Sequence, residues 1–140
     1  LIILVNIYGE NMDKIKTELA EYLSKYFKDT GFINIGIGNN IDIIIDSKCL
    51  YTVVGFKNQL FYLFVWIFDS KIEVNLKTTI KPDEVKYLDL SIEMNYELND
   101  NLDTILESIK SDVEKYFPKF IKTVEQGIKI IGERNERSLD

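Results

Sequence analysis

The segment 60–68 constrains the fold of this chain more than any other part of the sequence. It reads Leu-Phe-Tyr-Leu-Phe-Val-Trp-Ile-Phe and is apolar or aromatic at every position. Successive side chains of a β-strand point to opposite faces of the sheet, so a strand here is apolar on both faces. A hydrophobic core accounts for one face. The other face needs a pocket, a covering element or a binding partner, and it is the strongest functional indication in the sequence.

Short strands separated by turn residues surround this segment. We expect strands at 1–8, 32–37, 41–46, 49–56, 60–68, 71–80 and 86–98. The intervening pairs Ser47-Lys48, Lys57-Asn58 and Asp69-Ser70 have the length of tight hairpin turns, whereas 81–84 is a longer loop. Consecutive hairpins predict an antiparallel meander.

Two amphipathic helices flank the expected strands. Apolar residues recur at three- and four-residue spacing over 12–27, and Thr30-Gly31 predicts the end of that helix. A second apolar stripe comprises Leu102, Ile105, Ile109, Val113, Tyr116, Phe120, Val124 and Ile128. This stripe continues past Pro118, which predicts one kinked helix, and an Asn or Asp within 99–101 can cap its start.

Tight pairing through the Asp69-Ser70 turn predicts which side chains share a face of the sheet. It places Trp66 opposite Glu73, and directly paired residues lie on the same face. The expected inner face then carries Phe61, Leu63, Val65, Ile67, Ile72, Val74 and Leu76. The same procedure at the other turns adds Ile33, Ile35, Ile37, Ile41, Ile43, Ile45, Leu50, Thr52, Val54, Leu88, Leu90, Ile92, Met94 and Tyr96. The expected outer face carries Tyr51, Val53, Tyr62, Phe64, Trp66 and Phe68.

Composition and charge argue against several classes of function. The chain has 140 residues, 46% hydrophobic and 29% charged, which is typical of one globular domain, expected at 1–131 with a polar tail at 132–140. A net charge of -6 argues against a nucleic-acid surface, which needs clustered Lys and Arg. The absence of His removes the commonest general base and metal ligand, and we predict no metal site and no cofactor.

The remaining candidate motifs have ordinary structural interpretations. The single Cys49 cannot form an internal disulfide, which is typical of a cytoplasmic protein. The apolar segment 1–5 is too short to span a membrane. Gly36-Ile37-Gly38 lacks the third Gly and the following helix of a dinucleotide motif, and it indicates a hairpin turn. Acidic residues such as Asp42 and Asp46 are expected on a solvated face, so no catalytic residue is predicted.

The order of one strand, one helix, six strands and a long C-terminal helix resembles the START/polyketide-cyclase-like superfamily of birch-pollen-allergen-like and lipid-transfer proteins. The resemblance implies an α+β helix-grip fold, in which a curved seven-stranded antiparallel sheet wraps around the C-terminal helix and leaves an apolar cavity. The chain departs from the family in two places. The family usually has two short helices where 12–28 forms one, and its glycine-rich loop is reduced here to Gly36-Ile37-Gly38-Asn39-Asn40.

The resemblance implies binding or transport of an apolar or amphiphilic, lipid-like small molecule in that cavity. The candidate wall residues are Phe61, Leu63, Val65, Ile67, Ile72, Val74, Leu76, Leu90, Ile92, Met94, Tyr96, Ile109, Val113, Tyr116 and Phe120. A filled hydrophobic core would produce the same pattern, so both interpretations stay open. A cyclase- or hydrolase-type enzyme would use the same cavity, but the inner set offers only Tyr, Thr and Cys as reactive groups, which favours binding.

The outer aromatic residues predict a contact with a protein partner. Tyr51, Val53, Tyr62, Phe64, Trp66 and Phe68 would form an exposed apolar patch. Large patches of this kind usually mark interaction sites, and we expect a homodimer through this face. A protein-interaction module with a solid core, such as a small secretion chaperone or an immunity protein, is the third interpretation of the function.

Overall fold

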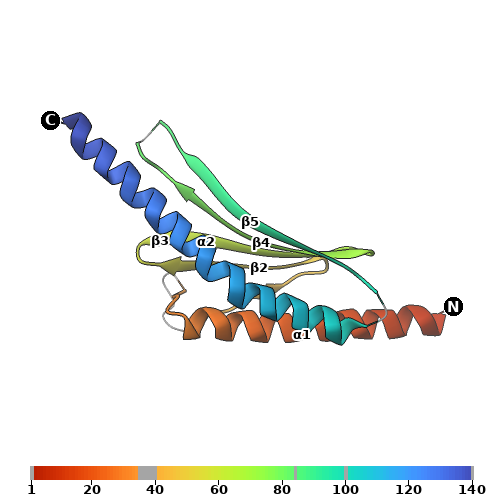
Figure 1. Cartoon of the computed structure of the whole chain (residues 1–140). Helices are drawn as coiled ribbons and strands as arrows, with labels where there is room; N and C mark the ends of the chain where they lie inside the picture. Colours follow the sequence, from red (N-terminus) through yellow and green to blue (C-terminus); the bar gives the residue numbers. More distant parts are fainter. Residues whose placement is uncertain (1, 35–40, 84, 100, 140) are drawn as a thin grey trace.

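The computed structural model describes residues 2–34, 41–83, 85–99 and 101–139, which form an α+β structure (Figure 1). Helix α1 (Ile2–Asp29) comes first and the long helix α2 (Leu102–Leu139) comes last. Between them lie β1 (Ile44–Ile45), β2 (Cys49–Phe56), β3 (Gln59–Ile67), β4 (Lys71–Ile80) and β5 (Leu88–Glu97). The strands form one open antiparallel sheet in the order β1-β2-β3-β4-β5, which confirms the predicted meander.

The expectation of seven strands is wrong, because the described residues contain a sheet of five. Residues 2–8, expected as a strand, form the first part of α1, and Gly9 lies inside this helix. Strand propensity is a weak preference that context overrides, whereas an established helix gains one hydrogen bond for each residue added. The apolar composition of this segment was therefore no guide to its secondary structure.

The strands expected at 32–37 and 41–46 are also shorter in the described residues. Of the segment 32–37, Ile33 forms an isolated bridge with Gly55. The predicted inner position of Ile33 is wrong, because Gly55 pairs with Leu60 of the outer face and Ile33 is 50% exposed. Residues 35–40, with the hairpin turn predicted at Gly36-Ile37-Gly38, lie outside the described residues. The strand expected at 41–46 is limited to β1. The sheet is consequently open and narrow, and α2 crosses one of its faces diagonally (Figure 1).

Helix α1 ends at the glycine that the sequence indicated. Gly31 has a φ of 90°, in the left-handed region that favours glycine. The Phe32 amide donates to the Phe27 carbonyl at 2.9 Å, and the Gly31 amide donates to the Lys28 carbonyl at 3.3 Å. The rings of Phe27 and Phe32 then pack with their centroids 4.9 Å apart. These contacts terminate the helix, and they hold Phe32, just after the helix, in the core.

Turn chemistry sets the register of the sheet. Lys57 and Asn58 have φ values of 48° and 66°, so they form the type of two-residue turn that matches the twist of the β2–β3 hairpin. At the next turn the Phe68 amide donates to the Lys71 carbonyl at 2.9 Å. The register that follows confirms the inner and outer faces predicted for β2 to β5.

Helix α2 is continuous from its cap to the end of the described chain. The Oδ1 atom of Asn101 accepts a hydrogen bond from the Thr104 amide at 3.2 Å, which confirms a cap within 99–101. Pro118 lies inside the helix and does not divide it. The helix also continues through 132–139, the segment expected as a polar tail.

The predicted apolar stripe of α2 is wrong at two positions, Tyr116 and Ile128, of which Ile128 is 38% exposed. Tyr116 is 37% exposed, whereas its neighbour Phe117 is fully buried. With 3.6 residues per turn, a step of four residues from the buried Val113 arrives at Phe117. Tyr116, three residues after Val113, instead lies at the margin of the helix face that contacts the core.

The hydrophobic core lies between the inner face of the sheet and the two helices. Helix α1 contributes Met12, Ile15, Leu19, Leu23 and Phe27. Helix α2 contributes Ile105, Leu106, Ile109, Val113, Phe117, Ile121 and Val124. Both helices therefore cover the same face of the sheet. The outer face carries exposed side chains, and in the described part of the chain neither helix packs against it.

Candidate functional site

Apolar side chains that are not part of the core lie on the outer side of β1, β2 and β3. This surface, called the aromatic face below, consists of Ile44, Tyr51, Val53, Leu60, Tyr62, Phe64, Trp66 and Phe68. Tyr51 lies directly opposite Phe64, so the two side chains share the outer face, as the sequence predicted. Ile44 and Leu60 were not among the outer residues predicted from the sequence. Since Ile44 pairs with Tyr51, the strand alternation that located the other residues would have found it.

A row of stacked rings runs along β3 within the aromatic face. The ring centroids of Phe64 and Trp66 are 6.2 Å apart with an interplanar angle of 9°, and those of Trp66 and Phe68 are 6.5 Å apart at 18°. The ammonium groups of Lys77 and Lys71 lie 5.8 Å and 5.4 Å from the centroids of Phe64 and Phe68. The rings are thus held in place by their neighbours, which lowers the entropic cost of binding a partner.

The outer face divides into an apolar half and a charged half. Within the aromatic face, exposure is 36–40% for Tyr51, Val53, Tyr62, Trp66 and Phe68. The other half, on β4 and β5, carries Lys71, Glu73, Lys77, Asp89, Glu93 and Glu97. A partner bound to the apolar half would therefore have charged groups of β4 and β5 along one side of the interface.

The predicted cavity wall separates into groups that differ in burial. The core cluster contains Phe61, Leu63, Val65, Ile67, Ile72, Val74, Leu76, Ile109 and Val113. The residues partly buried against it are Leu90, Ile92, Met94, Tyr96 and Phe120. A filled core accounts for the first group, so binding of a small molecule between the sheet and α2 stays a prediction.

The partly buried residues lie along the open margin of the sheet, where α2 only half covers the inner side of β5. This surface, called the β5–α2 strip below, consists of these partly buried residues, Leu90, Ile92, Met94, Tyr96 and Phe120, and of the more exposed Tyr116. The Tyr96 hydroxyl donates to Oδ2 of Asp112 at 2.7 Å. Burial, and then the bond to Asp112, raise the pKa of Tyr96 well above its usual value. Tyr96, one of the predicted cavity-wall residues, therefore uses its hydroxyl to connect β5 to α2.

Two tyrosines of α1 join the two helices. The Tyr22 hydroxyl lies 3.0 Å from the Lys110 carbonyl oxygen and 3.1 Å from Oε1 of Glu114. The Tyr26 ring meets Phe117 edge to face, with centroids 6.0 Å apart. Burial, and then the Glu114 charge, raise the pKa of Tyr26 to about 12. A phenol that holds its proton this strongly does not act as a base at neutral pH. The contacts of Tyr22 and Tyr26 connect α1 to α2.

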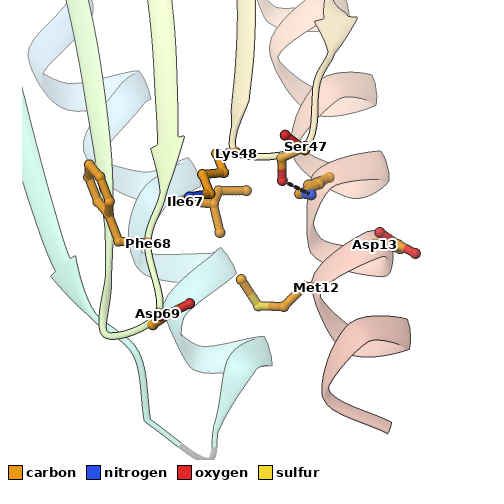
Figure 2. A pocket seen from close by; sticks show the side chains of 8 residues that line it. Met12, Asp13, Ser47, Lys48, Ile67, Phe68 and Asp69 are labelled. Carbon is orange, nitrogen blue, oxygen red and sulfur yellow. Dashed lines mark hydrogen bonds between the residues drawn. The ribbon is translucent and has the colours of Figure 1, made fainter. Parts of the chain in front are cut away.

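A surface pocket of about 360 Å³ lies between α1 and the β1–β2 and β3–β4 turns (Figure 2). Met12 points into it, and Nζ of Lys16 donates to the Ser47 carbonyl at 2.6 Å. Asp13 points away from the pocket on the helix, while Asp69 lies on the opposite wall (Figure 2). The two carboxylates are therefore not arranged as an acid–base pair.

Among the described residues, no cluster of His, Cys, Asp or Glu could hold a metal ion. Cys49 is buried, and burial raises the pKa of its thiol, which disfavours the reactive thiolate. Asp42 and Asp46 are exposed, as expected for a solvated face. In the parts of the chain that the structure describes, no helix combines the length and apolar composition needed to cross a bilayer.

Comparison with family models, with curated proteins and with solved structures gave no match for this chain. The resemblance to the START/polyketide-cyclase-like superfamily therefore stays a prediction. Two surfaces of the molecule carry apolar side chains outside the core, the aromatic face and the β5–α2 strip.

Proposed function

We propose that this protein is a non-enzymatic protein-interaction module whose aromatic face binds a second copy of the chain. The observation that carries the proposal is a row of stacked, partly exposed rings on a sheet face that neither helix covers in the described residues. Burial of apolar surface is the main favourable term in protein association. A partner that removes these rings from water therefore gains free energy from a surface that is already ordered.

The area of the aromatic face fits a modest dimer interface. An aromatic side chain presents about 150–250 Å², so the four rings that expose more than a third of their surface contribute on the order of 300 Å². The aliphatic members and Phe64 raise the apolar total to roughly 500 Å² for each protomer. Two copies would bury roughly 1,000 Å², which is the lower end of specific interfaces. We therefore expect a dissociation constant in the micromolar range.

A second copy suits the aromatic face because an apolar surface is complementary to itself. In a twofold dimer the same patch of both protomers forms the interface. The acidic residues of the outer face, such as Glu93 and Glu97, lie on β5 at the far side of the sheet. An arrangement that stacks one aromatic face on the other leaves these carboxylates at the margin, in contact with water.

Sedimentation velocity over a concentration series tests the proposal. The wild-type protein should change from monomer to dimer between about 1 and 100 µM. Trp66→Glu should stay monomeric at the highest concentration, because it places a charge in the middle of the stacked rings. Tyr116→Glu is the matched control, since Tyr116 and Trp66 are both 37% exposed but lie on opposite faces.

Circular dichroism should show that both variants keep the wild-type fold. The proposal is wrong if the wild type remains monomeric at every concentration. It is also wrong if Trp66→Glu dimerises as strongly as Tyr116→Glu.

A further inference from the structure

Strand β5 is a long edge strand that no other described strand pairs with on its open side. It is 10 residues long and pairs with β4 alone in the described part of the sheet (Figure 1). The opposite edge, β1, is only 2 residues long. Unpaired N–H and C=O groups on a long edge are a template for another strand, and proteins usually protect such edges with Pro, bulges or Lys. β5 contains neither Pro nor Lys and pairs with β4 without a bulge from end to end.

The hydrogen-bond pattern identifies which backbone groups lie on the open edge. The Leu98 amide donates to the Ser70 carbonyl at 2.9 Å, and the ladder continues in register from this pair. Bonded and non-bonded pairs alternate along an antiparallel ladder. Ser91, Glu93 and Asn95 therefore direct their N–H and C=O groups away from β4 and toward the open edge.

The side chains on the two sides of this edge define the chemistry of a fitting partner. On the inner side, the β5–α2 strip is apolar and only partly buried, so an added strand could complete its cover with apolar residues. On the outer side, β5 presents the exposed carboxylates Asp89, Glu93 and Glu97. Lys71 on the neighbouring strand already pairs with Glu73 at 2.8 Å. The outer side of the edge thus favours positive charge.

We propose that β5 binds an extended protein segment as an additional strand, in which apolar residues alternate with Lys or Arg. The apolar residues would complete the β5–α2 strip, and the basic residues would lie beside the carboxylates of the outer side, because paired residues share a face. A second β5 is a poor occupant, since it would bring two rows of carboxylates together and like charges on paired strands are destabilising. This surface is separate from the aromatic face, and the inference holds whether or not the chain dimerises.

The probe is a synthetic peptide with blocked ends and the sequence Lys-Val-Thr-Val-Lys-Ile-Thr-Val-Lys. Fluorescence anisotropy of the labelled peptide should show saturable binding. Amide hydrogen exchange should slow about tenfold or more at Ser91, Glu93 and Asn95 when the peptide is present, because their N–H groups become bonded. A peptide with Glu in place of each Lys should bind about tenfold more weakly.

A pair of double variants tests whether the backbone edge is the site. Ser91→Pro with Asn95→Pro removes two N–H groups that do not bond to β4, and Pro is tolerated on edge strands. Ser91→Ala with Asn95→Ala changes the same exposed side chains and keeps both N–H groups. The Pro variant should lose peptide binding, while the Ala variant should retain it.

A modified peptide keeps the test independent of how well the Pro variant folds. N-methylation at alternate peptide residues blocks one edge of the bound strand or the other, and it leaves the protein unchanged. One of the two methylated peptides should bind and the other should not, because an added strand uses a single edge.

Several results would overturn the inference. These are equal behaviour of the two methylated peptides, peptide binding without protection of the three amides, and equal binding by the folded Pro and Ala variants. Protection of these amides in concentrated protein without peptide would place a second copy on β5 and refute the choice of partner.

Discussion

Replacing Phe117 with Ala tests how α2 is seated on the sheet. Phe117 is fully buried and packs against Phe27 and Tyr26, with ring centroids 6.2 Å and 6.0 Å away. Truncation of a core Phe to Ala typically costs about 3–5 kcal/mol, which is a large share of the roughly 5–15 kcal/mol that stabilises a domain. Tyr116→Ala removes a neighbouring ring that is 37% exposed, and it should cost less than about 1 kcal/mol.

Urea unfolding followed by circular dichroism measures both changes. With a denaturant dependence of about 1–3 kcal/mol per molar urea, Phe117→Ala should lower the unfolding midpoint by about 2 M. Tyr116→Ala should leave it nearly unchanged. If Tyr116→Ala proved as costly as Phe117→Ala, α2 would be rotated so that the stripe predicted from sequence faces the core. The packing described here would then be refuted.

Three further predictions use the same protein. Gly31→Ala should lower the free energy of unfolding by about 1–2 kcal/mol, because Gly31 has a φ of 90° that Ala disfavours. Gly132→Ala should raise it by about 0.5–1 kcal/mol, because Gly132 lies in open space on α2 and Gly destabilises a helix. Equal effects would contradict the role of Gly31 as a helix cap. The pKa of Tyr26 rises from 10.0 to about 12 on folding, so the free energy of unfolding should be constant below pH 10 and fall from pH 10 to 12. This fall should be smaller in Tyr26→Phe. Cys49 should react slowly with a thiol reagent in the native protein and rapidly in urea, and fast native labelling would contradict its burial.

The sheet could be predicted from the sequence because its register depends on local features. Two-residue turns at Lys57-Asn58 and Asp69-Ser70 and strict alternation along β4 leave only one consistent pairing. The secondary structure of 2–8 could not be predicted in the same way. Its residues favour strands only weakly, and whether they join a helix or a sheet depends on the rest of the chain.

The two candidate surfaces differ in how much the sequence reveals about them. The aromatic face follows from alternation alone, so its residues could be identified before the fold was known. The open edge at β5 depends on strand order and on how far α2 covers the sheet, and neither is a local property. The misplacement of Tyr116 has the same origin, since steps of three and four residues look alike in a sequence until the direction of packing is known.

Quenching of tryptophan fluorescence is the most direct test of the proposed function, because Trp66 is the single tryptophan of the chain and lies within the stacked rings. If the aromatic face binds a second copy, iodide should quench Trp66 less, and its emission should shift to shorter wavelength, as concentration rises through about the micromolar range. Quenching and emission that stay constant from dilute to concentrated protein would contradict the proposal.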